Sequence, residues 1–496
     1  MNPVLRTKLS IMMFLQYFIW GAWGVVIFTF ISNLPTKHGL WFPGGYVGWI
    51  ATALPIGAMV SPIFVGLFVD RLFATERVLA ALHIIGGVLI GFGAWFCDQN
   101  LPLVEDAFNT AAKDTKVGDG DVLDALAKEE KLKKEADGVD KTSTGVFDKV
   151  EVHKVALADF QKNELEPALA KVRANPEVKS AVDRAYWTLL MCLLGYAICF
   201  MPSITLTNSI SFRNLSDPDK YFGSVRVLGT IGWIVAGLIV GFALKEQGAS
   251  SQPLYLAAAF SIVLGVFCLF LPHTPPAKEQ KSLGDALGLP ALAMLKNYPF
   301  LVFFICSFLV SVALSFYYQQ ANPFLTSLNL PYPVALQTIG QVSEIFFMLM
   351  IPVGLAKLGT KWMLAIGYLA WVIRYVSFAT TNVPLVLGLG IPLHGVCFDF
   401  FFVVSFLYVD RCAPKHLRAT AQSMITFVVL GLGWALGNVF AGEMTSVFAL
   451  GAGVDWYKYW LVPMVGSAAA MILFVLLFRE SPTVADSGTN LASASG

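Results

Sequence analysis

Long apolar runs separated by short polar segments dominate the hydropathy pattern of the chain. A helix needs about 20 apolar residues to cross the hydrocarbon core of a bilayer, and runs near this length recur from one end of the sequence to the other. They lie near residues 10–32, 46–69, 78–97, 186–210, 225–245, 254–272, 299–325, 335–356, 362–380, 385–409, 417–442 and 457–478. The pattern predicts an all-α membrane protein with twelve transmembrane helices.

Two polar stretches interrupt this pattern and divide the chain into expected domains. Residues 98–185 form a charged insert between spans three and four, where residues 121–136 and 147–172 carry apolar side chains at helical spacing and predict a helical hairpin. Residues 273–298 form a linker that separates the spans into two sets of six. We therefore expect an N-terminal six-helix bundle (1–97 and 186–272), the insert, a cytoplasmic linker, a C-terminal six-helix bundle (299–479) and a disordered tail (480–496).

The short loops indicate how these helices are oriented. If the spans alternate in direction, most arginine and lysine residues of the short loops fall on one side, which the positive-inside rule assigns to the cytoplasm. Both termini are then cytoplasmic, and the insert is extracytoplasmic, since long loops translocate largely regardless of their charge. We expect a multi-pass protein of the cell (inner) membrane.

Composition narrows the possible partners. The chain has 496 residues, of which 56% are hydrophobic and only 14% charged, against about 25% charged in soluble proteins. A net charge of +1 argues against a nucleic-acid partner. The seven cysteines are scattered, with no C-x-x-C pair, so we expect no metal, no disulfide framework and no cofactor.

Charged residues that stand inside the expected spans are candidates for function. A charged side chain at bilayer depth is costly and usually faces a cavity or a partner, so Asp399, in the apolar run 385–409, is the first functional candidate. The alternative is that Asp399 caps a broken helix or pairs with a basic neighbour. Arg226 and Glu344 lie in spans of opposite halves, which favours one shared central cavity.

Helical spacing places further side chains beside these charges. Arg226, Thr230 and Trp233 are spaced i, i+4 and i+7 and share one helix face, as do Gln341 and Glu344 at i, i+3. Stacking of a flat base on an aromatic ring contributes about 1–3 kcal/mol. Aromatic faces near the cavity would come from Trp20, Trp23, Trp233, Tyr317, Tyr318, Phe398 and Phe401, and polar contacts from Gln16, Gln319, Asn322, Gln341 and His394.

Plain structural roles stay open for several of these residues. Trp20 and Trp23 can equally pack in the core or lie in an interfacial belt. Asn438 can simply hydrogen-bond between helices, and His394 can be a satisfied histidine bonded to a neighbouring carbonyl.

One loop motif resembles that of the major facilitator superfamily. Gly66, Asp70, Arg71 and Arg77 match the family's G-x-x-x-D-R loop with its following base, and the resemblance implies that Asp70, Arg71 and Arg77 latch a cytoplasmic gate. The sequence around Pro352 repeats that around Pro62, in keeping with two parallel six-helix pseudo-repeats. The second copy departs from the motif, because Lys357 stands where the aspartate would be.

Across nearly all of the chain except the insert and the tail, the sequence resembles the bacterial nucleoside:proton symporters of the nucleoside permease type. The motifs that carry the likeness are FLQYFIWGAW from Phe14, RVLGTIGW from Arg226, QVSE from Gln341, AWVIR from Ala370 and CFDFF from Cys397. The resemblance implies nucleoside uptake driven by the proton gradient, with alternating access of a central site.

The same resemblance implies which residues bind substrate. Arg226, Thr230, Gln341, Glu344, Phe398 and Asp399 stand at matching positions. At other positions the chain departs from the family: Trp233 replaces a Phe, His394 a Tyr, and Ser315 and Tyr318 a Gln and an Asn. We include Trp233, Tyr318 and His394 in the expected substrate site.

The proton is expected to bind one of the two deep acids. We assign proton carriage to Asp399 and a substrate hydrogen bond to Glu344, although two coupled acids can share one titration. The alternatives are a facilitator for another polar solute such as a sugar, or a transceptor that binds nucleoside without carrying it. A membrane enzyme is disfavoured because no catalytic or phosphate-binding motif is present, and we expect the chain to act as a monomer.

Overall fold

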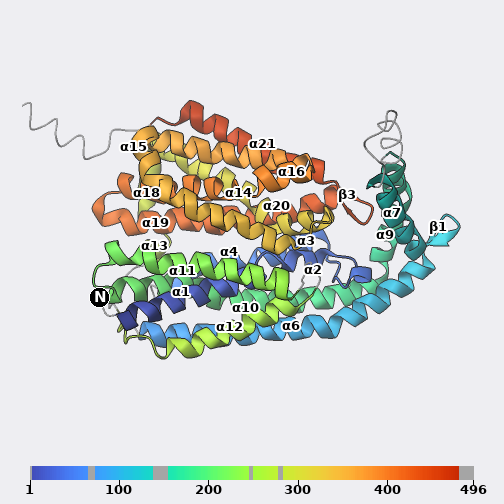
Figure 1. Ribbon diagram of the computed structural model, residues 1–496, viewed down its shortest axis with the longest axis horizontal. Helices are drawn as coiled ribbons and strands as arrows, with labels where there is room; N and C mark the ends of the chain where they lie inside the picture. The colour runs from blue at the N-terminus through green and yellow to red at the C-terminus, as the bar shows by residue number, and fades with distance from the viewer. Residues whose placement is uncertain (1–2, 65–72, 138–154, 245–249, 277–282, 480–496) are drawn as a thin grey trace, which may run out of the picture.

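Two elongated helical halves lie side by side, and a smaller helical part extends from one end of them (Figure 1). The computed structural model describes residues 3–64, 73–137, 155–244, 250–276 and 283–479. The predicted gate residues Asp70 and Arg71, part of the linker and the tail 480–496 lie outside these ranges.

The N-terminal half is built from long helices. Its elements are α1 (Pro3–Trp23), α2 (Ile27–Ser32), the 3-10 helix η1 (Pro35–Lys37), α3 (Gly44–Ala51), α4 (Ala53–Phe64), α6 (Thr75–Asp114), α10 (Pro176–Asn214), α11 (Pro218–Leu238), the π-helix η4 (Ile239–Ala243) and α12 (Gln252–Cys268).

The C-terminal half has more broken helices. Its elements are α13 (Leu283–Ala286), the 3-10 helix η5 (Leu289–Lys296), α14 (Tyr298–Ser327), α15 (Pro333–Ala379), α16 (Val383–Leu385), the π-helix η6 (Val386–Gly390), α17 (His394–Phe398), the π-helix η7 (Asp399–Val403), α18 (Val404–Cys412), the 3-10 helix η8 (Lys415–Leu417), α19 (Arg418–Thr426), the π-helix η9 (Phe427–Gly433), α20 (Trp434–Val447), β3 (Ala449–Leu450), β4 (Gly453–Val454) and α21 (Trp456–Leu477). Strands β3 and β4 form a small antiparallel hairpin.

Between α6 and α10 lies the insert. Its described elements are β1 (Lys116–Val117), β2 (Gly120–Asp121), α7 (Val122–Asp137), the π-helix η3 (Gln161–Leu165) and α9 (Glu166–Ala174). The first predicted insert helix corresponds to α7, whereas the second predicted helix is described only from residue 155 onward. Helices α6 and α10, with 40 and 39 residues, continue from the bundle into the insert without a break, past the boundaries expected at residues 98 and 185.

The helix lengths agree in part with twelve spans. Within the described residues, nine helices are long and apolar enough to cross a membrane, and the pair Val383–Gly390 and His394–Cys412, bent by 50°, makes a tenth if counted as one span. Helix α12 has only 17 residues. Helix α15 has 47 residues and covers two expected spans, and Gly359, at φ 71°, interrupts its helical backbone between them.

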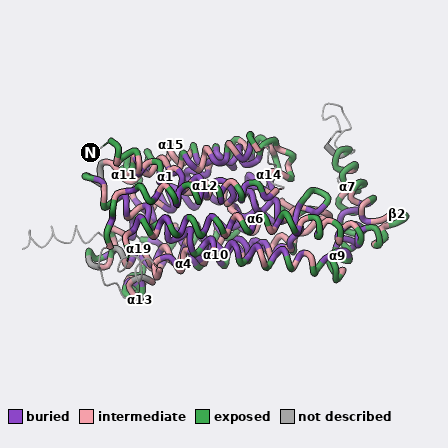
Figure 2. The backbone as a smooth tube through the Cα atoms, turned by 90° about the horizontal axis from the view of Figure 1, so that it is seen from below, coloured by how far each residue is buried: buried purple, intermediate pink, exposed green. Residues whose placement is uncertain are grey.

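The buried apolar side chains separate into one core for each half. One cluster runs from Leu9 to Leu271 and the other from Ala291 to Phe478, while a small third cluster of Val26, Val240 and Val334 joins the halves. Figure 2 shows the buried backbone inside the bundles and the mostly exposed backbone of α7. Each half therefore has a hydrophobic core of its own.

The halves touch mainly at the end that carries the insert, which we call the insert end (Figure 1). Helices α2 and α3 contact α14 and α20 there. Asn322 Nδ2 donates to Thr29 Oγ1 at 2.8 Å, and Asn438 Nδ2 donates to the carbonyl of Ala51 at 2.8 Å. These polar contacts hold the insert end closed.

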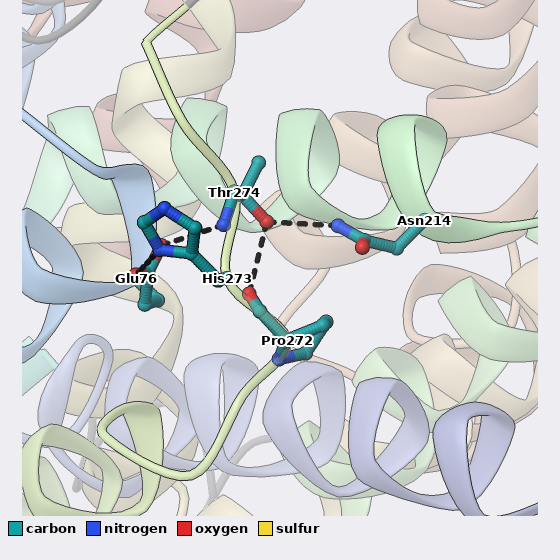
Figure 3. Close-up of polar contacts among 5 residues, drawn as sticks. All are labelled: Glu76, Asn214, Pro272, His273 and Thr274. Carbon is teal, nitrogen blue, oxygen red and sulfur yellow. Dashed lines mark hydrogen bonds and ion pairs between the residues drawn. The ribbon is translucent and has the colours of Figure 1, made fainter.

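At the opposite end, a polar cluster ties three segments of the N-terminal half together (Figure 3). Glu76, at the start of α6, accepts from the backbone N–H of Thr274 at 3.0 Å and lies 2.8 Å from His273 Nδ1. Asn214 Nδ2, at the end of α10, donates to Thr274 Oγ1 at 2.9 Å. The cluster fixes the helix ends beside Arg77, whose side chain is exposed.

Candidate functional site

The deep charged residues come together between the halves. Glu344 of α15 interacts electrostatically with Arg226 of α11 and with Asp399 at the start of η7. The Glu344 side chain is 14% exposed, and Asp399 is fully buried. The structure thus brings the three charges of spans five, eight and ten into one region.

Arg226 rests on an aromatic ring of the first helix. Its guanidinium carbon lies 4.0 Å from the ring centroid of Tyr17, and no residue of an opposite charge is paired with it among the described salt bridges. Thr230 and Trp233 follow on the same face of α11 and are partly buried. The guanidinium is therefore held against the ring by a cation–π contact.

His394 is the centre of a second group of contacts. Its Nδ1 lies 3.0 Å from Nη1 of Arg374, and its Nε2 lies 3.4 Å from Nε2 of Gln341 and 3.9 Å from Oε2 of Glu344. Close packing makes this possible, since a Cβ added to Gly340 would lie 2.9 Å from the His394 Cβ. His394 therefore links α15 and α17 through side chains rather than through a backbone carbonyl.

Aromatic rings form a continuous wall across the two halves. Trp20 lies 5.2 Å from Trp233 and 6.3 Å from Trp434, and Trp434 lies 5.5 Å from Tyr318, all measured between ring centroids. Phe398 stacks on His394 at 6.0 Å. Such faces suit a flat, partly apolar ligand.

A small pocket opens beside this wall. It is lined from the N-terminal half by Gly21, Val25 and Trp233 and from the C-terminal half by Tyr318, Gln337 and Gln341, among others. Of the predicted substrate residues, Trp233, Tyr318 and Gln341 line the pocket. The other six are not part of its lining: Arg226, Thr230, Glu344, His394, Phe398 and Asp399.

Asp399 has no hydrogen-bond partner for either carboxylate oxygen among the described residues. It heads the π-helix η7, and helical segments of this kind often mark functional sites. Neither a capping role nor a basic partner is seen for its carboxylate in that part of the chain.

Several residues expected to contact a ligand are already hydrogen-bonded within the protein. Gln16 donates to Ser203 Oγ at 2.8 Å and meets His83 Nε2 at 2.8 Å, and all three side chains are buried. Gln319 donates to the carbonyl of Asn438 at 2.9 Å. With Asn322 also bonded to Thr29, these amides hold helices together.

Two further residues belong to the site although the sequence did not single them out for it. Arg374 is fully buried, and its guanidinium carbon lies 3.4 Å from the centroid of the Tyr317 ring. An arginine inside the apolar run 362–380 gives the same signal that identified Asp399. Trp434 carries no such signal, because tryptophan is common in apolar spans.

No group of three or more His, Cys, Asp or Glu side chains able to hold a metal ion occurs among the residues that the structure describes. The region presents hydrogen-bonding side chains, aromatic faces and two carboxyl groups.

Comparison with known proteins finds similarity to nucleoside transporters over nearly the whole chain. The family model described as nucleoside H+ symporter matches residues 3–102 and 172–483, which leaves most of the insert unmatched. The putative nucleoside transporter YegT of Escherichia coli is 34% identical over 491 residues, covering 96% of this chain and 94% of the relative. The nucleoside permease NupG of the same organism is 26% identical, with 99% of both chains covered.

Solved structures show the same fold. The crystal structure of the nucleoside transporter NupG superimposes with a TM-score of 0.71 at 24% identity, covering 97% of this chain and 100% of that one. A D-xylose-proton symporter, at 14% identity, gives a TM-score of 0.58.

Proposed function

The chain belongs to the nucleoside H+ symporter family, and we propose that it imports nucleosides together with protons by alternating access. Its relatives are transporters and permeases, and the chain is accordingly a transporter and not an enzyme. The observation that carries the proposal is the aromatic wall formed by both halves beside Arg226, Glu344 and Asp399. It combines stacking surfaces with buried groups that can hold hydroxyls and a proton.

We also propose the full twelve-span topology. At a rise of 1.5 Å per residue, a continuous α15 would be about 70 Å long, which is more than twice the thickness of the hydrocarbon core, about 30 Å. A turn at Gly359 would instead make it two antiparallel spans. Counting α12 and the bent segment from α16 to α18 as one span each then gives six spans per half. The separate cores of the two halves support two bundles.

The orientation follows from the charges of the loops. Placing the arginine- and lysine-rich loops in the cytoplasm puts both termini inside the cell and the insert outside, in the cell (inner) membrane. The closed insert end would then be the outer gate. Arg77, at the opposite end, would belong to the cytoplasmic gate, to which we also assign Asp70 and Arg71 from their loop motif.

Within the site, each group has a proposed role. Trp233, Tyr318 and Phe398 would stack on the base, while Arg226, Thr230 and Gln341 would bind its polar edge or the sugar. Asp399, fully buried and without a partner among the described residues, would carry the proton, and Glu344 would accept a substrate hydrogen bond. We propose a monomer as the transporting unit.

Uptake into proteoliposomes tests the proposal. We expect an inward proton gradient to drive accumulation of labelled nucleoside, a protonophore to abolish it, and excess unlabelled nucleoside but not sugar to compete. Competition by sugar alone would favour a sugar facilitator. Nucleoside binding without counterflow across the sealed bilayer would favour a transceptor.

A further inference from the structure

We propose that Arg374, acting through His394 and Gln341, makes the site present a hydrogen-bond donor to the base. The site then selects nucleosides whose base presents a carbonyl oxygen over those that present an amino group. The inference rests on the proposed function and refines it to a substrate class. Arg374 acts here as a positioning residue, because it does not line the pocket itself and contacts His394, which in turn contacts the pocket residue Gln341.

The first step is the contact between Arg374 and His394. A guanidinium group has five N–H donors and no acceptor, so the 3.0 Å contact between Arg374 Nη1 and His394 Nδ1 requires Nδ1 to accept. An accepting Nδ1 carries no proton. The neutral imidazole of His394 must therefore carry its proton on Nε2, and a doubly protonated ring would lose this contact.

The second step is that the proton on His394 Nε2 decides the orientation of the Gln341 amide. The Nε2–H of His394 points to the Gln341 amide, whose nearer atom, 3.4 Å away, is placed as nitrogen. Two donors facing each other form no hydrogen bond, and in this orientation Gln341 Oε1 is buried without a partner among the described residues. A half-turn of the amide pairs Oε1 with His394 and removes the contact between two donors, while the NH2 group moves to the buried position that Oε1 had occupied. Which orientation an amide takes is decided by the hydrogen-bond network.

Glu344 does not compete for the same hydrogen. Its Oε2 lies 3.9 Å from His394 Nε2, beyond hydrogen-bond distance. Gln341 is thus the acceptor within reach of His394.

The third step concerns what Gln341 then offers to a ligand. With Oε1 turned to His394, its NH2 group takes the buried position that has no partner among the described residues. Gln341 also lines the pocket together with Trp233 and Tyr318. A base lying against these rings would meet a donor at its edge, and a buried donor needs an acceptor such as a carbonyl oxygen.

Pairs of nucleosides that differ at this group test the selection, and in each pair the adjacent ring nitrogen also changes, from protonated beside the carbonyl to bare beside the amino group. Inosine and adenosine differ by a carbonyl and an amino group at one ring position, and adenosine has no base carbonyl at all. Uridine and cytidine form a milder pair, because cytidine keeps one carbonyl. An unpaired buried donor costs enough to weaken binding about fivefold or more, so inosine should bind at least that much more tightly than adenosine.

The experiment uses the purified full-length protein in nanodiscs, with binding of all four nucleosides and nitrogen-15 NMR of labelled histidine. The signal that His394→Gln removes belongs to His394, and it should show a bare Nδ1 and a protonated Nε2. Arg374→Met should mix the two tautomers and abolish the inosine preference. Arg374→Lys, which keeps a donor, should retain the Nε2-protonated tautomer and the inosine preference. Gln341→Glu, which presents only acceptors when ionised, should favour adenosine and gives a second test if Arg374→Met does not fold.

The outcomes separate this inference from the proposed function. A protonated Nδ1 in the wild-type protein, or equal binding of inosine and adenosine, overturns the inference while leaving nucleoside transport intact. Binding of none of the four nucleosides overturns the proposed function and the selection with it.

Discussion

Oε2 of Glu344 lies 3.9 Å from Nε2 of His394, and its carboxylate interacts electrostatically with Asp399, so the two deepest acids of the C-terminal half share one buried region. Their surroundings differ. Glu344 also interacts with Arg226, whereas neither oxygen of Asp399 has a hydrogen-bond partner in the described part of the chain. A carboxyl without a partner is the better proton carrier, because no interaction with a nearby cation is lost when it becomes neutral.

We therefore predict that Asp399→Asn uncouples transport from the proton gradient. Asparagine keeps the size of the side chain but cannot exchange a proton, so nucleoside counterflow should persist while proton-driven accumulation is lost. Both are measured in the same proteoliposomes. Glu344→Gln is the matched comparison, and if it uncouples transport while Asp399→Asn does not, the two roles are reversed.

Trp233 provides a test of base stacking. It lines the pocket and lies against Trp20, so Trp233→Ala should weaken nucleoside binding by about 1–3 kcal/mol, the usual effect of losing one aromatic–base stack. Isothermal titration calorimetry on the purified protein measures this. Trp362→Ala is the control, because Trp362 is 53% exposed and should leave affinity unchanged. Unchanged affinity in Trp233→Ala, with a lower melting temperature, would make Trp233 a packing residue.

Gln16 should matter for stability and not for substrate affinity. Gln16→Leu leaves His83 Nε2 buried without its partner, which costs about 1–3 kcal/mol of unfolding free energy, whereas Ser203 Oγ keeps its bond to the Phe200 carbonyl. Thermal unfolding should show the loss, while nucleoside affinity stays at the wild-type value. The double variant Gln16→Leu with His83→Leu should lose less than the sum of the single changes, since it removes both members of the pair. A specific loss of affinity in Gln16→Leu would return Gln16 to the binding site.

The pair Thr29 and Asn322 tests whether the insert end must open. Their side chains hydrogen-bond at 2.8 Å between the two halves, so cysteines at both positions should form a disulfide that stops transport until a reductant is added. The single cysteine variants are the controls, and six of the seven native cysteines are buried. Full transport by the cross-linked protein would contradict alternating access at this end.

The charged residues of the site could be found from the sequence, because charge at bilayer depth is a local signal that needs no knowledge of the fold. Arg226, Glu344 and Asp399 were identified in this way and do meet in one region. The actual bonding of Gln16 could not be predicted, since His83 and Ser203 lie 67 and 187 positions away and only packing brings them together. Arg374 carries the same local signal as these charges, but its role could not be predicted, because that role depends on its distance from His394.

The long helices could also be predicted from a local signal, the hydropathy pattern, but the points at which they end could not. The hydropathy pattern ends span three at residue 97, where the charged insert begins, and starts span four at residue 186, where the insert ends. In the structure α6 and α10 run on into the insert, because helical hydrogen bonding needs no apolar surface. Polar side chains on an extended helix simply face water.

The last prediction concerns Gly451, which joins the insert to the C-terminal half. The N–H of Ala452 donates to Glu129 Oε1 at 3.5 Å, and Glu129 also accepts from Gln161 at 2.6 Å. Gly451 has a φ of +58°, and a Cβ there would lie 2.7 Å from Glu129 Oε1 and 2.8 Å from Cγ of Gln161. Gly451→Val should therefore strain the hairpin by about 1–2 kcal/mol and separate it from the insert.

Hydrogen exchange measures this separation directly, and α7 and residues 449–454 should exchange faster in Gly451→Val. Gly453→Val is the matched control in the same hairpin, because the nearest atom to an added Cβ there is the Leu450 carbonyl oxygen at 3.9 Å. Valine also suits the extended backbone of β4, so this variant should exchange like the wild-type protein. Equal exchange in both variants would mean that the Glu129 contact does not hold the insert against the C-terminal half, and that α6 and α10 alone fix its position.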